Sequence, residues 1–191
     1  MNPKYAIVVA VAALVTLQTS CSRGSERGAQ EQLQVISAAG EGRMDAVRSF
    51  LASGGNPNVT NNTGQTALLA ATIGKHADIV TELLARGANP NIADSMGQTP
   101  IFFAAYNLDL NAASALIGAG ADVNSRTQSG EFALLRAVTW GNSAMVELLV
   151  KGGADMTMKP TDERVPSPLK IATEGQMTEI AATLRNAGAK E

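Results

Sequence analysis

Few side chains in this sequence are of the types that carry catalytic chemistry. His76 is the only histidine and Cys21 the only cysteine, so the chain has no His/Cys cluster with metal-ligand spacing. A lone histidine without a nearby nucleophile or second ligand is not a catalytic group. We expect the His76 imidazole to bond the last carbonyls of a helix instead. The sequence therefore predicts no metal and no cofactor.

Other chemistry-bearing residues recur with the scaffold. Asp122 and Asp155 occupy equivalent places in successive copies of a repeating pattern, and Asp78 lies at the start of an expected helix, so turn and capping roles are favoured over a general acid/base pair. The pairs at 54–55 and 152–153 are Gly-Gly steps that follow expected helices rather than strands, which excludes a phosphate-binding loop of the usual kind. We predict that the protein is not an enzyme.

The length and net charge of the chain limit which classes of protein and partner remain possible. A chain of 191 residues with 45% hydrophobic and 17% charged residues is typical of one globular domain. Its net charge of -2 provides no basic surface for phosphate neutralisation, so nucleic acid is not an expected partner.

The first twenty residues are typical of a secretory signal. One positive charge, Lys4, precedes an uninterrupted small and apolar run from Ala6 to Leu17, and small and polar residues follow. The run is shorter than the roughly 20 residues that a membrane-spanning helix needs. We assign residues 1–20 to a signal peptide.

Cys21, directly after this signal, has two interpretations. It is either an incidental residue near an ordinary cleavage site or the lipid-accepting cysteine of a bacterial lipoprotein, and we favour the second. Ser20 resembles the matching position of a lipobox, whereas Gln18 stands where that pattern has an aliphatic residue, and Ser22 resembles an outer-membrane sorting signal. This resemblance implies a periplasmic protein tethered to the outer membrane. Residues 21–32 are small and polar, as in a flexible tether.

From residue 33 onward the chain repeats itself at a constant spacing. The segments GQTALLAA, GQTPIFFAA and GEFALLRA begin at Gly64, Gly97 and Gly130, so the step from the first to the second equals the step from the second to the third. Thr66 and Thr99 are expected to cap the helices that follow them, and Pro100 suits a first helical position. Self-similarity at this period predicts a solenoid of stacked units.

Each unit contains a second helical pattern. Paired alanines at 70–71 and 104–105 keep the first helix slim enough for close stacking. Apolar residues then recur at i, i+1, i+4 and i+5, as in residues 79, 80, 83 and 84, which predicts a second helix with one apolar stripe. Gly87, Gly120 and Gly153 are expected to end these second helices in a left-handed conformation.

These motifs together resemble the ankyrin repeat. The resemblance implies an all-α fold, an ankyrin-repeat solenoid of five stacked helix-turn-helix units with short β-turn fingers. We place the repeats at about 33–62, 63–95, 96–128, 129–161 and 162–191, with the outer two as caps and two extra residues before the last. Leu69, Phe102, Leu135 and Lys170 replace a histidine of the family pattern, so apolar packing is expected at the first three.

In proteins that this chain resembles, the concave face binds partners. The register of the ankyrin repeat implies that the partner-binding residues are Gln65, Ile73, Met96, Gln98, Tyr106, Asn107, Glu131, Thr139 and Trp140. It also places Thr63, Ser95 and Ser129, at the tips of the fingers, on this face. Tyr106 and Trp140 stand out, because rigid amphipathic aromatics are favoured in binding hot spots. The alternative is that each ring fills a gap between helices. Four other aromatics are interpreted as packing residues: Phe50, Phe102, Phe103 and Phe132.

Two functions follow from the resemblance. The first is a monomeric protein–protein interaction module in the bacterial cell envelope that binds an exported or periplasmic partner, as inhibitor or immunity factor of a hydrolase. The second is an accessory or chaperone-like factor supporting a periplasmic enzyme such as a catalase.

Overall fold

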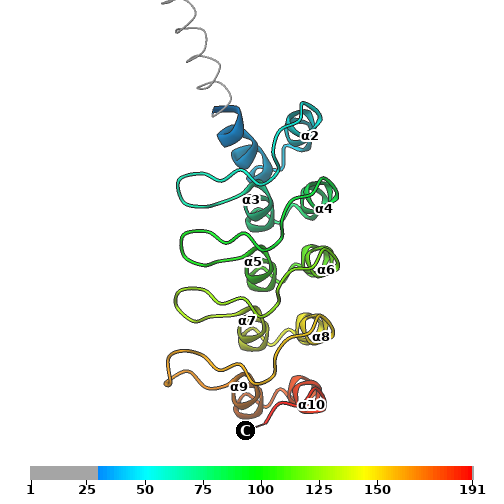
Figure 1. The fold of residues 1–191 in the computed structure, drawn as a ribbon. Coiled ribbons are helices and arrows are strands. Elements are labelled where there is room, and N and C mark those ends of the chain that lie inside the picture. The colour runs from blue at the N-terminus through cyan, green and yellow to red at the C-terminus, as the bar shows by residue number, and fades with distance from the viewer. Residues whose placement is uncertain (1–29, 191) are drawn as a thin grey trace, which may run out of the picture.

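Helix pairs and hairpin loops alternate along the chain and stack into one elongated solenoid (Figure 1). The computed structural model describes residues 30–190. Ten helices lie in this part of the chain. They are a first helix at residues 30–40, then α2 (Met44–Ala52), α3 (Ala67–Ile73), α4 (Ala77–Ala85), α5 (Pro100–Tyr106), α6 (Leu110–Gly118), α7 (Ala133–Thr139), α8 (Ser143–Lys151), α9 (Pro168–Glu174) and α10 (Thr178–Asn186).

The helices form two columns. The first helix, α3, α5, α7 and α9 form an inner column, and α2, α4, α6, α8 and α10 form an outer column, with the loops projecting from the inner side (Figure 1). The expected all-α solenoid is confirmed. The loops, which we call fingers, contain one isolated antiparallel bridge, between Thr60 and Thr66, and no longer strand in the described residues.

The starts of the inner helices follow the sequence signals with one exception. The Thr66 hydroxyl accepts a hydrogen bond from the N–H of Leu69 at 3.1 Å, as expected, and Pro100 occupies the first turn of α5. The prediction that Thr99 caps α5 is wrong. Its hydroxyl lies 2.8 Å from the hydroxyl of Ser125 in the next repeat, and its side chain makes no capping bond.

The core is built from the slim inner helices and the stripes of the outer ones. The paired alanines are buried, and Leu69, Phe102 and Leu135 are only 0%, 3% and 6% exposed, so apolar packing does replace the family's histidine there. The outer-helix stripes are buried as expected at Ile79, Val80, Leu83, Met145, Val146 and Leu149. Their last members, Leu84 and Val150, are only half-buried. A core that runs the length of the stack results, because each repeat packs only on its neighbours.

Glycines end the outer helices. Gly87, Gly120 and Gly153 have φ of 84°, 84° and 92°, the left-handed conformation that the sequence predicted.

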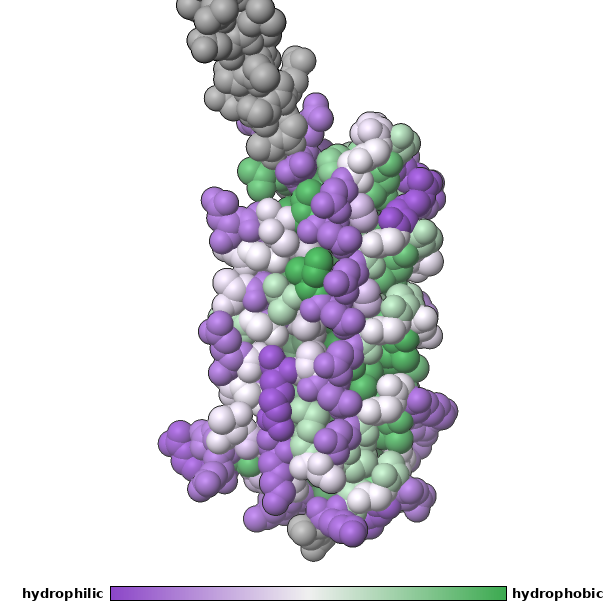
Figure 2. Space-filling model, in the orientation of Figure 1, coloured by the Kyte–Doolittle hydropathy of each residue, from purple (hydrophilic) through white to green (hydrophobic). Residues whose placement is uncertain are grey.

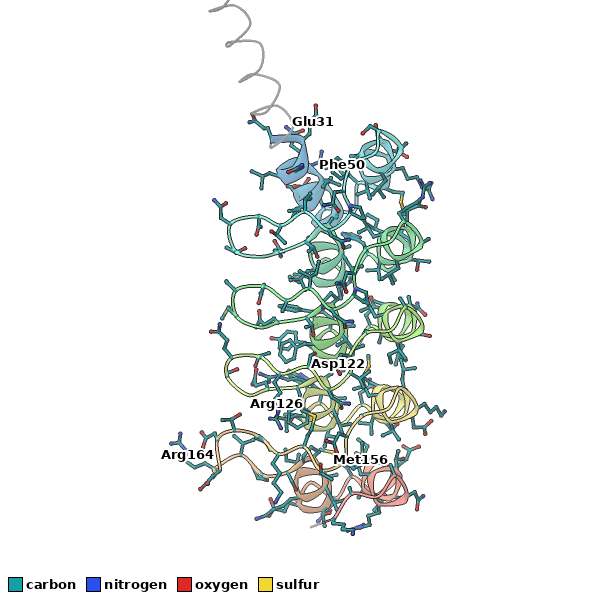
Figure 3. All side chains as sticks on the ribbon, in the orientation of Figure 1. Glu31, Phe50, Asp122, Arg126, Met156 and Arg164 are labelled. Atoms are coloured by element: carbon teal, nitrogen blue, oxygen red, sulfur yellow. The ribbon has the colours of Figure 1, made fainter. Side chains whose placement is uncertain are left out.

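An asparagine then joins each repeat to the next. Asn58 donates to the carbonyl oxygen of Gly87 at 3.2 Å and accepts from the N–H of Asn89 at 2.7 Å. Asn91 and Asn124 make the same two bonds one and two repeats later. We call this pair of bonds the asparagine clamp. Figure 2 shows a column of hydrophilic residues running along the stack, and Figure 3 labels Asp122, which is bonded to the second clamp, in that region.

The fingers are also joined to one another. The N–H of Ser95 donates to the carbonyl oxygen of Thr63 at 2.8 Å, and the N–H of Gln128 donates to that of Met96 at 2.9 Å. Within the fingers, Asn61 and Asp94 accept bonds from the N–H groups two and four residues later, which fixes the turns.

The described part begins with helical residues. Residues 30–32 are already helical, whereas the sequence suggested a tether up to residue 32. The predicted signal peptide, Cys21 and the rest of the tether lie outside the described residues.

Candidate functional site

Two half-exposed aromatic rings from adjacent repeats meet at the ends of the inner helices. Tyr106 is the last residue of α5, and Trp140 is the C-cap of α7, one repeat later. Their ring centroids are 6.5 Å apart with an interplanar angle of 87°, which is an edge-to-face contact. Tyr106 is 46% exposed and Trp140 56% exposed. Both rings therefore contact each other and still present surface to solvent.

Further aromatics support Tyr106 from within the helix. Phe103 lies edge-on to Tyr106 at 6.5 Å, and Phe102 lies edge-on to Phe103 at 5.7 Å. Phe102 is buried and Phe103 is half-buried, so the series leads from the core to the surface. Phe103 therefore packs as expected and, in addition, supports the Tyr106 ring.

Arg136 holds Tyr106 from another side. Its guanidinium lies 5.7 Å from the Tyr106 ring centroid, a cation–π arrangement, and it forms an ion pair with Glu131. Its Nε is buried without a hydrogen-bond partner. Glu131 thereby fixes Arg136, and Arg136 fixes the tyrosine ring. We call Tyr106, Trp140, Arg136 and Glu131 the aromatic site.

Structural roles account for the chemistry-bearing residues among the described positions. The His76 Nε2 lies 3.2 Å from the carbonyl oxygen of Gly40, the last residue of the first helix, so it bonds a carbonyl of the preceding repeat rather than the last carbonyls of α3 beside it. Asp122 and Asp155 accept bonds from N–H groups two residues later, as turn residues do. No group of three or more His, Cys, Asp or Glu side chains gathers within residues 30–190 in a way that could hold a metal ion. Over the same residues, no helix is both long and apolar enough to cross a membrane.

A comparison with protein families decides the classification. The model for ankyrin repeats in three copies matches residues 35–127 and again residues 104–190, which together span nearly all of the described chain. The chain belongs to the ankyrin repeat family. No curated protein matches it significantly. Ankyrin repeats are protein-binding modules, so we expect the functional site on exposed surface rather than in a catalytic pocket.

Four residues of the set expected from ankyrin register present apolar surface. Besides Tyr106 and Trp140, Ile73 is 39% exposed at the end of α3, and Met96 is 58% exposed at the tip of a finger. Ile73 precedes Tyr106 by one full repeat, so they occupy the same position on successive inner helices.

The polar members of that set are largely engaged within the ankyrin stack. Asn107 donates to the carbonyl oxygens of Thr72 and Ile73 at 3.1 and 3.3 Å, and the Thr139 hydroxyl donates to that of Leu135 at 2.8 Å. The other three are half-buried: Gln65, which accepts from Asn61, Gln98, whose N–H bonds Asp94, and Glu131, which pairs with Arg136. Of these, Glu131 alone belongs to the aromatic site. The structure gives the others roles in joining or shaping the repeats.

Sequence reasoning did not single out three further residues. Arg136 was not singled out, although it is the charged neighbour of both Glu131 and Tyr106. Leu108 and Leu110, 36% and 38% exposed, lie on either side of the start of α6. The signal was available for Leu108, because a bulky apolar residue stands where other repeats have Lys75 or Gly141.

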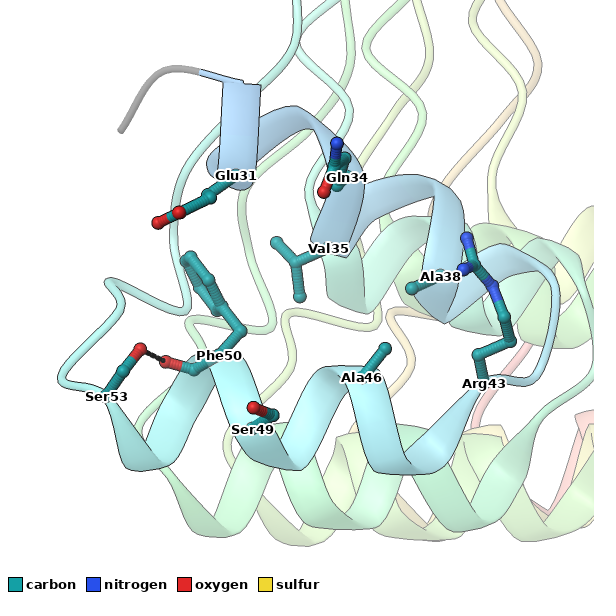
Figure 4. Close-up of a pocket in the computed structure, with 9 residues that line it drawn as sticks. All are labelled: Glu31, Gln34, Val35, Ala38, Arg43, Ala46, Ser49, Phe50 and Ser53. Carbon is teal, nitrogen blue, oxygen red and sulfur yellow. Dashed lines mark hydrogen bonds between the residues drawn. The ribbon is translucent and has the colours of Figure 1, made fainter. Parts of the chain in front are cut away.

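A groove at the other end of the stack lies apart from the aromatic site. It has a volume of about 690 Å³ between the first helix and α2, with Val35 from the first helix facing Phe50 of α2 and Ala38 lying farther along the groove, toward Ala46 (Figure 4). Glu31 and Arg43 lie at its edges (Figure 4). The groove occupies the end of the stack, where no preceding repeat covers the first helix pair in the described residues.

Proposed function

We propose that this ankyrin repeat protein binds a partner protein through the surface formed by the aromatic site together with Ile73 and Met96. The observation that carries the proposal is the contact between Tyr106 and Trp140, which joins two adjacent repeats and leaves both rings about half exposed. Rings fixed in advance lose little conformational freedom on binding, which favours affinity. Trp and Tyr are also the residues most enriched in binding hot spots.

The exposure of Trp140 argues against the gap-filling alternative. A ring that fills a space between helices is expected to be buried, whereas more than half of Trp140 faces solvent. Removing it should leave little empty space in the core.

The charge around the rings favours an apolar partner segment. Arg136 is already paired with Glu131, and Tyr106 lies over its guanidinium, so this cation has a partner inside the chain. We therefore propose that the partner presents an aliphatic or aromatic side chain on an uncharged loop. Met96 and Ile73 are further exposed apolar side chains, which we include in the surface that such a loop would cover.

Trp140 is the single tryptophan of the chain, so one substitution, Trp140→Ala, tests the contribution of this ring to binding. Proteins captured by the full chain from envelope extracts would be identified and purified, and each would be titrated against the wild type and Trp140→Ala. We expect the substitution to weaken binding by about 2 kcal/mol or more, the usual size of a hot-spot loss. The free energy of unfolding of the Trp140→Ala protein should change by less than about 1 kcal/mol, since this side chain lies on the surface.

Val165→Ala is the matched control. Val165 is 39% exposed on the finger before α9 and lies outside the proposed surface, so its truncation should leave affinity unchanged. A Trp140→Ala protein that melts far below the wild type, but binds normally while folded, would remove Trp140 from the binding surface.

We further propose that the protein is exported and lipidated at Cys21. The signal-like residues 1–20 and the cysteine after them support this proposal. Cys21→Ser should convert a protein of the detergent phase into a soluble or unprocessed one, and an unmodified mature N-terminus in wild-type mass spectra would contradict lipidation. For an envelope protein, inhibition of a hydrolase and support of an enzyme such as a catalase are the two roles we propose. The activity of the captured partner, with and without this protein, separates them.

A further inference from the structure

The junction between the fourth and fifth repeats lacks the asparagine clamp. Thr157 occupies the position of Asn58, Asn91 and Asn124, and its hydroxyl donates to the carboxylate of Asp155 at 2.7 Å, within its own turn. Asn124, one junction earlier, instead reaches the carbonyl oxygen of Gly153 and the N–H of Asp155. No side-chain hydrogen bond from Thr157 crosses to the described residues 162–190, which we call the C-terminal repeat.

A cavity lies where this clamp would be. Its volume is about 320 Å³, and Thr157, Gly188 and Lys190 are among the residues that line it. Gly188 follows α10 with a φ of 98°, so it corresponds to Gly87, Gly120 and Gly153, whose carbonyl oxygens are the clamp acceptors at the other three junctions. The acceptor is therefore present in the C-terminal repeat, and the donor is missing.

The main-chain hydrogen bonds between fingers also stop at this junction, although Gly130 of the third finger still lies against Thr161 of the fourth. The main-chain bonds that join the first three fingers are not continued to the fourth, which departs from the parallel course of the others (Figure 1). Its Arg164 turns back to pair with Asp162 at 2.8 Å and points away from the stack (Figure 3). One side-chain bond remains, from Arg126 to the carbonyl oxygen of Lys159 at 2.8 Å.

The opposite end of the solenoid has more polar bonds across its junction. The first repeat carries the Asn58 clamp, and His76 adds a bond from the second repeat to the carbonyl oxygen of Gly40. Both ends have a neighbour on one side in the described chain, so position alone would give them equal tendencies to open. The outer helices α8 and α10 pack on each other more closely than α2 and α4 do, so the proposed difference between the two ends rests on these polar bonds.

We propose that the C-terminal repeat opens from the stack as a unit while the first repeat stays docked. Opening separates α9 from α7 and α10 from α8, which are the contacts that remain at this junction. Local opening of this kind follows contiguous structural units and occurs where the stabilising contacts are fewest. It uncovers the apolar faces of α7 and α8.

The same motion reaches the aromatic site. Gly141, directly after Trp140, lies against the Met177 side chain of the α9–α10 turn, because a Cβ built on it would lie 3.9 Å from the methionine methyl group. Opening removes this neighbour from the turn that carries Trp140. This link to binding rests on the proposed function, whereas the opening itself does not.

Hydrogen exchange followed by mass spectrometry on the full chain tests the opening without any partner. Amides of α9 and α10 should exchange faster than those of the first helix, α2 and the central repeats. Thr157→Asn supplies the missing donor and should slow exchange in α9 and α10 by about tenfold, the scale of a gained pair of net hydrogen bonds. Exchange in α3 to α6 should not change.

Asn124→Thr is the matched variant. It removes the clamp one junction earlier, so α7 and α8 should join the fast-exchanging unit, and this result stands even if Thr157→Asn does not fold. Equal protection of the two end repeats in the wild type would overturn the proposal, as would a Thr157→Asn protein with unchanged exchange in α9 and α10. A failed binding test at Trp140 would leave these results untouched.

Discussion

Three non-glycine residues of the described chain adopt the left-handed backbone conformation, all at one position of the repeat. Lys75, Leu108 and Gln176 have φ of 62°, 57° and 57°, and Gly141 occupies the matching place with 65°. The position joins an inner to an outer helix and requires this geometry in each of these repeats. A side chain there costs about 1–2 kcal/mol, because the Cβ crowds the following carbonyl oxygen.

Lys75→Gly should therefore stabilise the protein. Relief of the strain exceeds the extra backbone freedom that glycine adds to the unfolded chain, roughly 0.5–1 kcal/mol, so we expect a net gain of about 0.5–1 kcal/mol in the free energy of unfolding. Chemical denaturation measures it. Lys75→Ala removes the same charge but keeps the Cβ, and should show no such gain. A glycine variant less stable than the alanine variant would contradict the strain.

Residue roles were predictable from sequence where the cause is local. The Thr66 cap and Pro100 in the first turn of α5 depend on a few adjacent residues, and both were predicted. Thr99 failed because its partner Ser125 comes from the next repeat. Glu131 was predicted to bind a partner, which stays a prediction, whereas its ion pair with Arg136 was not predicted.

At the scale of helices, the stack depends on the width of its inner column. Ala104 and Ala105 of α5 are fully buried, and α5 packs on both α3 and α7. The constant repeat spacing and the paired alanines made this arrangement predictable. The clamp bonds were not predicted, because each joins residues of two different repeats that only the stacked fold brings together.

Ala105→Leu should test this packing. The larger side chain has no space between neighbouring inner helices, so we expect a loss of roughly 1–3 kcal/mol in stability from overpacking. Thermal melting followed by circular dichroism measures this loss. The spectrum of the folded protein should be dominated by helix. Ala119→Leu, at an exposed position after α6, is the control and should melt near the wild type. A neutral effect at Ala105 would mean that the helices are less closely stacked.

Across the whole molecule, several surface carboxylates are held in their charged form. The hydrogen bond from the Thr157 hydroxyl, followed by that from the Thr157 N–H, lowers the pKa of Asp155 below its ordinary value of 3.8. The hydrogen bonds from Arg164 lower the pKa of Asp162, and those from Ser37 together with the charge of Arg43 lower the pKa of Glu41. Two of these three groups flank the fourth finger.

This pattern predicts loss of stability in acid. A carboxyl whose pKa is lower in the folded state stabilises the fold above its unfolded pKa, and this stabilisation is lost as pH falls through the folded pKa. The melting temperature should therefore change little from about pH 7 to about pH 5 and should fall below the ordinary aspartate pKa of 3.8. Asp155→Asn should flatten the acid limb of this profile, whereas Asp78→Asn removes a carboxylate without touching the fourth finger. Identical acid limbs for wild type and Asp155→Asn would contradict the assignment.

The asparagine clamp also makes the array extensible. Each of Asn58, Asn91 and Asn124 gives its bonds to the repeat that follows, and that repeat brings its own asparagine for the next one. A unit such as residues 96–128 thus carries a matching acceptor at one side and a donor at the other, so an internal duplication of it would find complementary bonds at both new boundaries. Placed after Thr157, the same duplicated unit would meet no donor. The number of central repeats is therefore free to change by duplication, and the position of Thr157 marks the boundary beyond which this mode of growth stops.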